Sequence, residues 1–218
     1  MIKAVVFDLD MTLIDFLGMK RKASNAAARA MIRAGLESPV KKLEKELFEF
    51  YLKEIESNRI FGHFLKQRKV SSERILAAGI NAYIKKKLTC LEPYPGVKRV
   101  LSRLRRKGLR LGIITDAPRL KAYKRLDLMG IADYFEFVIG FEDTGRHKPS
   151  PLPFRRALKL LKLKPNQIMY VGDSIDRDIK GAKAIGMVTC LAAYGSTKKL
   201  PNLADYSIRS IEELPGLI

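Results

Sequence analysis

The residue types that could do chemistry occur in four short clusters, each directly after a predicted strand. The clusters are Asp8-Leu9-Asp10-Met11-Thr12, Thr115-Asp116, Lys148, and Gly172-Asp173-Ser174 with Asp178. In a doubly wound sheet the ligand crevice lies outside the carboxyl ends of the strands, so such a fold would bring all four clusters to one edge. Carboxylates gathered over an anion repel it unless a cation neutralises them, and oxygen ligands suit Mg²⁺. The clusters therefore predict a site for a divalent cation and an anion.

The elements that must position these clusters follow from the hydrophobic pattern. Residues 2–7 form a short, mostly apolar run of the kind that becomes a buried parallel strand. Further along, helical and strand patterns alternate. The predicted helices are 97–107, 119–129, 151–161 and 176–185, and the predicted strands are 109–115, 137–139, 168–171, 188–191 and 206–208. This alternation predicts an α/β fold, a doubly wound parallel sheet with helices on both faces. Ser150, followed by Pro151, and Asp176 are the expected N-caps of the helices they precede.

The stretch between the first strand and this alternating region has a different character. Apolar residues there recur at spacings of three and four, as in Leu43, Leu47 and Phe50, and no good strand candidate interrupts them. The segment Glu92-Pro93-Tyr94-Pro95-Gly96 is typical of a linker. We therefore predict a catalytic core of residues 1–14 and 93–218, with an all-helical insertion of residues 15–92.

The order of the clusters resembles that of the haloacid dehalogenase superfamily. Its motifs are an aspartate pair DxDxT, a Ser or Thr that ends the next core strand, a lysine, and an acidic GDxxxxD, and all four occur here in that order. The likeness extends to YPGV at 94–97, HKPSP at 147–151 and GAKAIGM at 181–187. It implies a Rossmann-like core with a helical cap inserted after the first motif. It also implies a Mg²⁺-dependent phosphatase that hydrolyses a small phosphorylated metabolite through an aspartyl-phosphate intermediate.

The resemblance further implies a role for each acidic residue of the motifs. Asp8 would be the nucleophile that takes up the phosphoryl group, and Asp10 the general acid and base. The ligands of Mg²⁺ would be a carboxylate oxygen of Asp8, the backbone carbonyl of Asp10 and the carboxylate of Asp173. Asp178 would support them by orienting metal-bound water or Lys148.

The phosphoryl oxygens would be held by the remaining motif residues. Thr115 supplies a hydroxyl donor and Lys148 a point charge, both suited to the charge that develops in the transition state. Backbone N–H groups of Leu9, Asp10 and Asp116 would complete the cradle for the phosphate.

The balance of charge leaves another class of partner open. The chain has 42 Lys and Arg against 23 Asp and Glu, a formal net charge of +19, which attracts anions such as nucleic acid or phosphorylated substrates. The basic residues lie in scattered groups without the interleaved aromatic residues that stacked bases need. We therefore interpret them as solvated helix faces and do not expect nucleic acid as a partner.

Cysteine usage and hydropathy predict a cytoplasmic protein. Cys90 and Cys190 lie far apart without CxxC spacing, so neither a disulfide framework nor a zinc site is expected. No stretch approaches the roughly 20 consecutive apolar residues of a membrane span, and charge interrupts the N-terminus before a signal peptide could form. No motif predicts the identity of the substrate or the oligomeric state.

Alternative functions remain at this stage. One is another enzyme on the same scaffold, a sugar phosphomutase or a 2-haloacid dehalogenase, although relatives that cleave carbon–halogen bonds lack an aspartate at the position of Asp10. The other is a basic RNA-binding or regulatory protein with a weak active site. Met11 departs from the family pattern, because the phosphatase and mutase branches usually have glycine there. We expect its side chain to crowd the loop or the pocket.

Overall fold

The chain divides into two compact units. The computed structural model describes residues 1–53, 59–196 and 203–218. One unit consists of Met1–Asp15 and Glu92–Ile218, and the other of Phe16–Leu91. Among the described residues, no helix combines the length and the apolar character needed to cross a membrane.

The first unit contains a six-stranded sheet in which every neighbouring pair of strands is parallel. The strands are β1 (Ala4–Phe7), β2 (Arg110–Ile114), β3 (Phe137–Ile139), β4 (Ile168–Gly172), β5 (Val188–Ala192) and β6 (Tyr206–Ile208). Their order is β3-β2-β1-β4-β5-β6, so the chain reverses direction across the sheet beside β1. This confirms the predicted doubly wound α/β fold.

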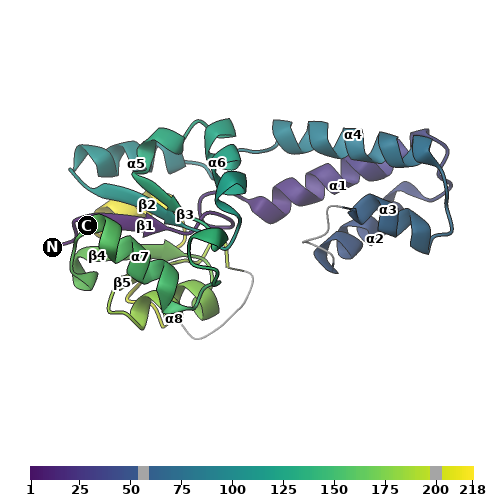
Figure 1. The fold of residues 1–218 in the computed structure, drawn as a ribbon. Coiled ribbons are helices and arrows are strands. Elements are labelled where there is room, and N and C mark those ends of the chain that lie inside the picture. The colour runs from purple at the N-terminus through teal and green to yellow at the C-terminus, as the bar shows by residue number, and fades with distance from the viewer. Residues whose placement is uncertain (54–58, 197–202) are drawn as a thin grey trace. The chain divides into compact units, whose positions relative to one another are not determined.

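Helices cover both faces of the sheet, which explains why β1 at its centre is apolar and buried throughout. The helices are α5 (Val97–Arg106), α6 (Arg119–Leu128), α7 (Pro151–Leu161) and α8 (Lys180–Lys183). Helices α5 and α6 lie on one face, and α7 and α8 on the other (Figure 1). Short helical turns complete the unit: η1 (Ala132–Tyr134), η2 (Phe141–Asp143), η3 (Pro165–Gln167), η4 (Ile175–Ile179) and η5 (Ile211–Gly216).

The register of the central strands places their carboxyl ends level with one another. Phe7 at the end of β1 lies opposite Ile113 of β2 and Val171 of β4. Residues that follow these strands therefore emerge at the same edge of the sheet. At that edge Asp8, Thr115 and Asp173 are all buried despite their polar side chains.

The second unit is entirely helical in its described part. Its helices are α1 (Phe16–Arg33), α2 (Val40–Lys53), α3 (Ile60–Gln67) and α4 (Glu73–Thr89). Helix α1 packs along α4 and against α2 (Figure 1). The unit has its own apolar core, which includes Ala27, Met31, Leu43, Leu47 and Phe64. Gly79 allows α4 to approach α1 closely, because a Cβ atom at this position would overlap the side chain of Met31 on α1.

Local signals in the sequence agree with the structure except around residue 175. Ser150 is an N-cap as predicted, and its hydroxyl accepts a hydrogen bond from the N–H of Leu152. The prediction of Asp176 as an N-cap is wrong. Ser174 caps this segment by accepting from the N–H of Arg177, and the chain then forms a π-turn at η4 before α8. Asp176 instead pairs with Lys180 at the surface.

Candidate active site

A buried ion-pair network links three of the predicted site residues. Lys148 Nζ donates to Asp8 Oδ1 and to Asp178 Oδ1, each at 2.6 Å. It also donates to the hydroxyl of Tyr170 at 3.2 Å, and that hydroxyl in turn donates to Asp178 Oδ1 at 3.1 Å. The side chains of Lys148, Asp8 and Asp178 are no more than 7% exposed. The ammonium group of Lys148 is thereby fixed directly beside the carboxylate at the end of β1.

Burial and mutual repulsion shift the pKa values of these groups. Burial raises the pKa of Asp8 well above its ordinary value, and the negative charges of Asp178 and Asp173 add to the rise against the opposing charge of Lys148. Burial raises the pKa of Asp173 to about 7, with Asp178 again contributing. Although burial disfavours the ammonium group, Asp178 and Asp8 hold the pKa of Lys148 well above its usual range. Three carboxyl groups thus lie close to one buried lysine, and their mutual repulsion adds to the rise in the pKa values of Asp8 and Asp173.

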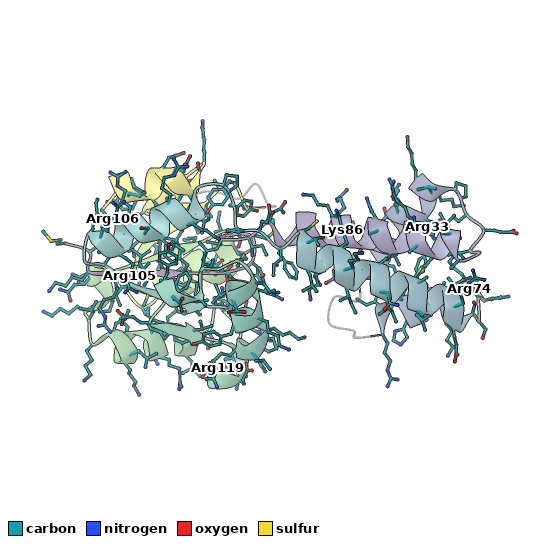
Figure 2. The ribbon with its side chains drawn as sticks, turned by 90° about the horizontal axis from the view of Figure 1, so that it is seen from above. Arg33, Arg74, Lys86, Arg105, Arg106 and Arg119 are labelled. Atoms are coloured by element: carbon teal, nitrogen blue, oxygen red, sulfur yellow. The ribbon has the colours of Figure 1, made fainter. Side chains whose placement is uncertain are left out.

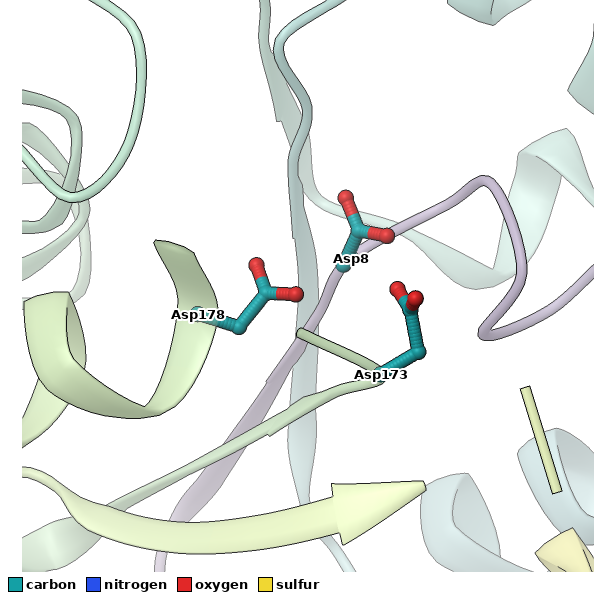
Figure 3. A group of neighbouring side chains, drawn as sticks. All are labelled: Asp8, Asp173 and Asp178. Carbon is teal, nitrogen blue, oxygen red and sulfur yellow. The ribbon is translucent and has the colours of Figure 1, made fainter. Parts of the chain in front are cut away.

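The excess carboxylates form a cluster that suits a divalent cation. Asp8, Asp173 and Asp178 each offer a carboxylate oxygen, and these oxygens lie within 4.8 Å of one another. Figure 3 shows the three carboxyl groups as neighbours, with Asp8 after β1, Asp173 after β4 and Asp178 on η4. Hard oxygen donors of this kind fit Mg²⁺, and a cation there would offset the repulsion that raises the two pKa values. Asp178 is also occupied by Lys148 and by the backbone N–H of Ser174, which donates to Oδ2 at 3.0 Å.

The hydroxyl and backbone groups at this edge are held in place by local bonds. The hydroxyl oxygen of Thr12 lies 3.4 Å from Asp8 Oδ2 and 3.5 Å from Asp173 Oδ1, so its one proton can be donated to either member of the cluster. The hydroxyl of Thr115 accepts from the N–H of Ala117 at 3.1 Å, within the loop after β2. Asp116 Oδ1 accepts from the backbone N–H of Lys148 at 2.9 Å. The loops after β1, β2 and β4 thus meet as the sequence predicts.

The carboxylate of Asp10 has a different partner from those of the acidic cluster. Its two oxygens accept from Nη1 of Arg125 on α6, at 2.7 Å from Oδ1 and 2.5 Å from Oδ2. The side chain of Asp10 is 27% exposed and that of Arg125 is 14% exposed. The metal role predicted for Asp10 concerns its backbone carbonyl. Its carboxylate, the predicted general acid and base, pairs with the guanidinium of Arg125 and is not a member of the acidic cluster.

The loop that carries Asp8 and Asp10 is packed against the segment after β5. Met11 adopts the left-handed region, with φ of 66°, where glycine costs least. The hydroxyl of Tyr194 donates to the carbonyl oxygen of Thr12 at 2.7 Å. Gly195 lies so close to Met11 that a Cβ atom at position 195 would overlap the Met11 carbonyl oxygen.

Two residues beside the site were missed by sequence reasoning. Tyr170 lies in the apolar strand segment Ile-Met-Tyr-Val-Gly, so its pattern indicates only a core residue. Arg125 is one of 42 basic residues and belongs to no motif. The one signal in the sequence was the hydroxyl of Tyr170 in a strand predicted to be buried, because a buried hydroxyl needs a hydrogen-bond partner.

The basic residues expected to form solvated helix faces are spread over several elements of both units. Figure 2 shows Arg33 and Arg74 on α1 and α4, and Arg105 and Arg119 on α5 and α6, with side chains that project away from the ribbon. Several are engaged in local bonds: Arg105 donates to the carbonyl of Tyr134, and Arg119 pairs with Asp143. All four of these arginines are exposed to solvent.

Comparisons with known proteins agree on one family. Residues 5–192 match the family model described as "Haloacid dehalogenase-like hydrolase". The chain is 36% identical to the glyceraldehyde 3-phosphate phosphatase of Methanopyrus kandleri, over 97% of this chain and 93% of that protein. It is 27% identical to the phosphoglycolate phosphatase of Aquifex aeolicus, over 99% and 96%. Among solved structures, a HAD phosphatase from Thermococcus onnurineus matches with a TM-score of 0.68 and 27% identity, over 99% of this chain and 97% of that one.

Proposed function

The chain belongs to the haloacid dehalogenase-like hydrolases and is a phosphatase, and from this premise we propose that it hydrolyses a small phosphomonoester through an aspartyl-phosphate on Asp8. The observation that carries the proposal is the buried contact between Lys148 and Asp8 at the carboxyl end of β1. A lysine there neutralises the nucleophile and the incoming phosphoryl oxygens together. Since the relatives are glyceraldehyde 3-phosphate and phosphoglycolate phosphatases, three-carbon and two-carbon phosphates are the substrates we would test first.

We also propose that the site uses Mg²⁺, held by the carboxylates of Asp8 and Asp173 and the backbone carbonyl of Asp10. Such an ion would supply charge neutralisation for the phosphoryl oxygens. Asp178 has the supporting role, because its two oxygens already accept from Lys148 and Ser174. The donor chemistry and the raised pKa values of Asp8 and Asp173 support this assignment.

The proposed reaction has two steps. An oxygen of Asp8 attacks phosphorus, and the bond from phosphorus to the substrate oxygen breaks with its electron pair moving to that oxygen, which takes a proton from Asp10. A water molecule then attacks the aspartyl-phosphate, Asp10 removes a proton from it, and the Asp8 carboxylate leaves with the electrons of its bond to phosphorus. Thr115, Lys148 and the N–H groups of Leu9, Asp10 and Asp116 are the proposed phosphoryl contacts.

We propose that the helical unit of residues 16–91 serves as a cap that limits access of water to this reaction. A hydrolysable covalent intermediate requires controlled entry of water, which lids commonly provide. The chain enters the helical unit at Phe16, soon after the loop that carries the proposed nucleophile.

The test is release of inorganic phosphate from glyceraldehyde 3-phosphate, phosphoglycolate and a panel of other phosphorylated metabolites, with Mg²⁺ and with chelator. Asp8→Asn keeps the shape of the side chain and removes the nucleophile, so we expect turnover to fall by about a thousandfold or more. Asp173→Ala should weaken the apparent affinity for Mg²⁺ by about 10- to 100-fold, measured by titration of activity with the metal. Circular dichroism of both variants verifies the fold.

The outcomes separate the parts of the proposal. Phosphate release that survives Asp8→Asn would contradict the assignment of the nucleophile. Release that is indifferent to chelator would contradict the role of Mg²⁺, and an unchanged titration of Asp173→Ala would contradict that ligand.

A further inference from the structure

The contact between Arg125 and Asp10 joins two elements that are distant in the chain. Arg125 lies on α6, after β2, and Asp10 lies in the loop after β1, 115 residues earlier. The guanidinium Nη1 contacts both carboxylate oxygens of Asp10, and both side chains are less than a third exposed. A planar, permanently charged guanidinium restricts where a carboxylate can point far more than solvent does.

The placement of Asp10 differs from that of the other aspartates at this edge. Asp8, Asp173 and Asp178 gather around one centre, whereas the partner of the Asp10 side chain is Arg125. Asp10 is separated from Asp8 by only one residue, so without a second restraint its carboxylate could turn toward the same centre. Arg125 supplies that restraint from a different strand–helix connection.

We propose that Arg125 is a positioning residue that holds the carboxyl group of Asp10 where it can exchange a proton with the substrate oxygen. This inference rests on the proposed function, in which Asp10 protonates the leaving oxygen. A protonated carboxyl retains an oxygen that accepts a hydrogen bond, so Arg125 can hold one oxygen while the other delivers the proton. After the first step Asp10 is a carboxylate, and the same guanidinium holds it while it takes the proton from water. In this role Arg125 acts through Asp10 and touches neither phosphorus nor the bond that breaks.

The test compares substrates that need this proton with one that does not. Phosphoglycolate and glyceraldehyde 3-phosphate release an alkoxide, which requires protonation, whereas p-nitrophenyl phosphate releases a stable phenolate. The variants are Arg125→Met, which removes the guanidinium, and Arg125→Lys, which keeps a cation. Lys124→Met, at an exposed position one residue earlier on the same helix, is the matched control for loss of charge. The measured quantity is kcat/KM, which covers the steps up to release of the leaving group.

Because general acid catalysis contributes about 10²- to 10⁴-fold, we expect Arg125→Met to lower kcat/KM for the alkyl phosphates by about 10- to 100-fold, and for p-nitrophenyl phosphate by less than about threefold. For the alkyl phosphates, the loss should appear in kcat and not in KM. Arg125→Lys should recover part of the lost kcat, and Lys124→Met should have the kcat and KM of the wild type.

Three results would overturn the proposal. They are an equal loss on alkyl and aryl phosphates, a rise in KM with kcat unchanged, and no change at all. The second would mean that Arg125 binds the substrate itself. If the wild-type protein hydrolyses none of these phosphates, the proposed function fails and this inference with it. If the wild type hydrolyses them in a manner that depends on Asp8, a loss without substrate selectivity rejects only the role of Arg125.

Discussion

Among the residues that the structure describes, each unit buries one lysine, Lys148 in the sheet unit and Lys20 in the helical unit, and their surroundings differ. In the sheet unit, Lys148 lies between the carboxylates of Asp8 and Asp178. In the helical unit, Lys20 donates to the hydroxyl of Tyr83 at 2.7 Å, and its Nζ lies 4.8 Å from the ring centre of Tyr51. A carboxylate offers the lysine a full negative charge, whereas the face of an aromatic ring and a phenol oxygen offer only partial negative charges. The first arrangement suits chemistry on an anion, whereas the contacts of Lys20 with Tyr51 and Tyr83 join α1 to α2 and α4.

The largest effect is expected from Lys148→Met. It leaves Asp8 and Asp178 buried without their common cation, so the free energy of unfolding should fall by about 3 kcal/mol or more, and phosphatase turnover should be lost. Urea unfolding and phosphate release measure the two effects. Adding Asp178→Asn should restore part of the stability and none of the turnover. If Lys148→Met is as stable as the wild type, the network is not the charged arrangement described above.

A matched pair of tyrosine substitutions sharpens the contrast between the lysines. Tyr170→Phe and Tyr83→Phe each remove one hydroxyl that accepts from a buried ammonium group. Each should lower the free energy of unfolding by about 1–2 kcal/mol. Tyr170→Phe should also reduce kcat, because Lys148 and Asp178 lose a shared neighbour, and steady-state kinetics would reveal this. An unchanged kcat would limit Tyr170 to a structural role.

The smallest effect is expected at an exposed lysine–carboxylate pair, Lys183 and Asp205, which are 51% and 40% exposed. Lys183→Met should change the free energy of unfolding by less than about 0.5 kcal/mol, because solvent screens such pairs. Asp205→Asn should cost about 1 kcal/mol, since Asp205 also accepts from the N–H and hydroxyl of Thr189 at 2.8 and 2.7 Å. Thermal unfolding of both variants provides the comparison. A larger loss from Lys183→Met than from Asp205→Asn would reverse this interpretation.

The same pair predicts a pH dependence. Burial opposes ionisation of Asp205, but the bonds from Thr189 and Lys183 prevail and hold its pKa below its ordinary value. A carboxyl group whose folded pKa is depressed stabilises the fold at pH values above its unfolded pKa, and that contribution is lost as the pH falls through the folded pKa. Stability measured from about pH 5 down to about pH 2 should therefore decline less in Asp205→Asn than in the wild type. Parallel curves would contradict the contribution of Asp205.

Periodicity and motif order were sufficient to predict the parallel sheet and the meeting of Asp8, Lys148 and Asp173 at one edge. Those features depend on strands whose ends are marked by a change from apolar to polar residues. The contacts of Arg125 and Tyr170 could not be predicted. The first depends on the distance between α6 and the loop after β1, and the second on the side of β4 from which the Tyr170 hydroxyl projects. The error at Asp176 has a similar origin. Two polar residues, Ser174 and Asp176, could each begin the helix, and the π-turn that decides between them has no periodic signature.

Met11 shows how a residue that is unexpected in its motif is accommodated. The expectation that its side chain would crowd the loop concerned volume, but the observed adjustment is in the backbone, where φ is 66°. A non-glycine residue in this region costs on the order of 1 kcal/mol. The loop thus has a backbone conformation that glycine would adopt without this cost, so Met11 is expected to lower stability.

The close packing of Gly195 on Met11 limits which residues position 195 can accept. Even alanine at position 195 would force the carbonyl of Met11, and with it the loop from Asp8 to Thr12, to move. A library of random variants that is screened for lost turnover with retained folding should therefore find position 195 as readily as the motif residues. A search for altered substrate preference would have to leave that glycine unchanged and vary other positions.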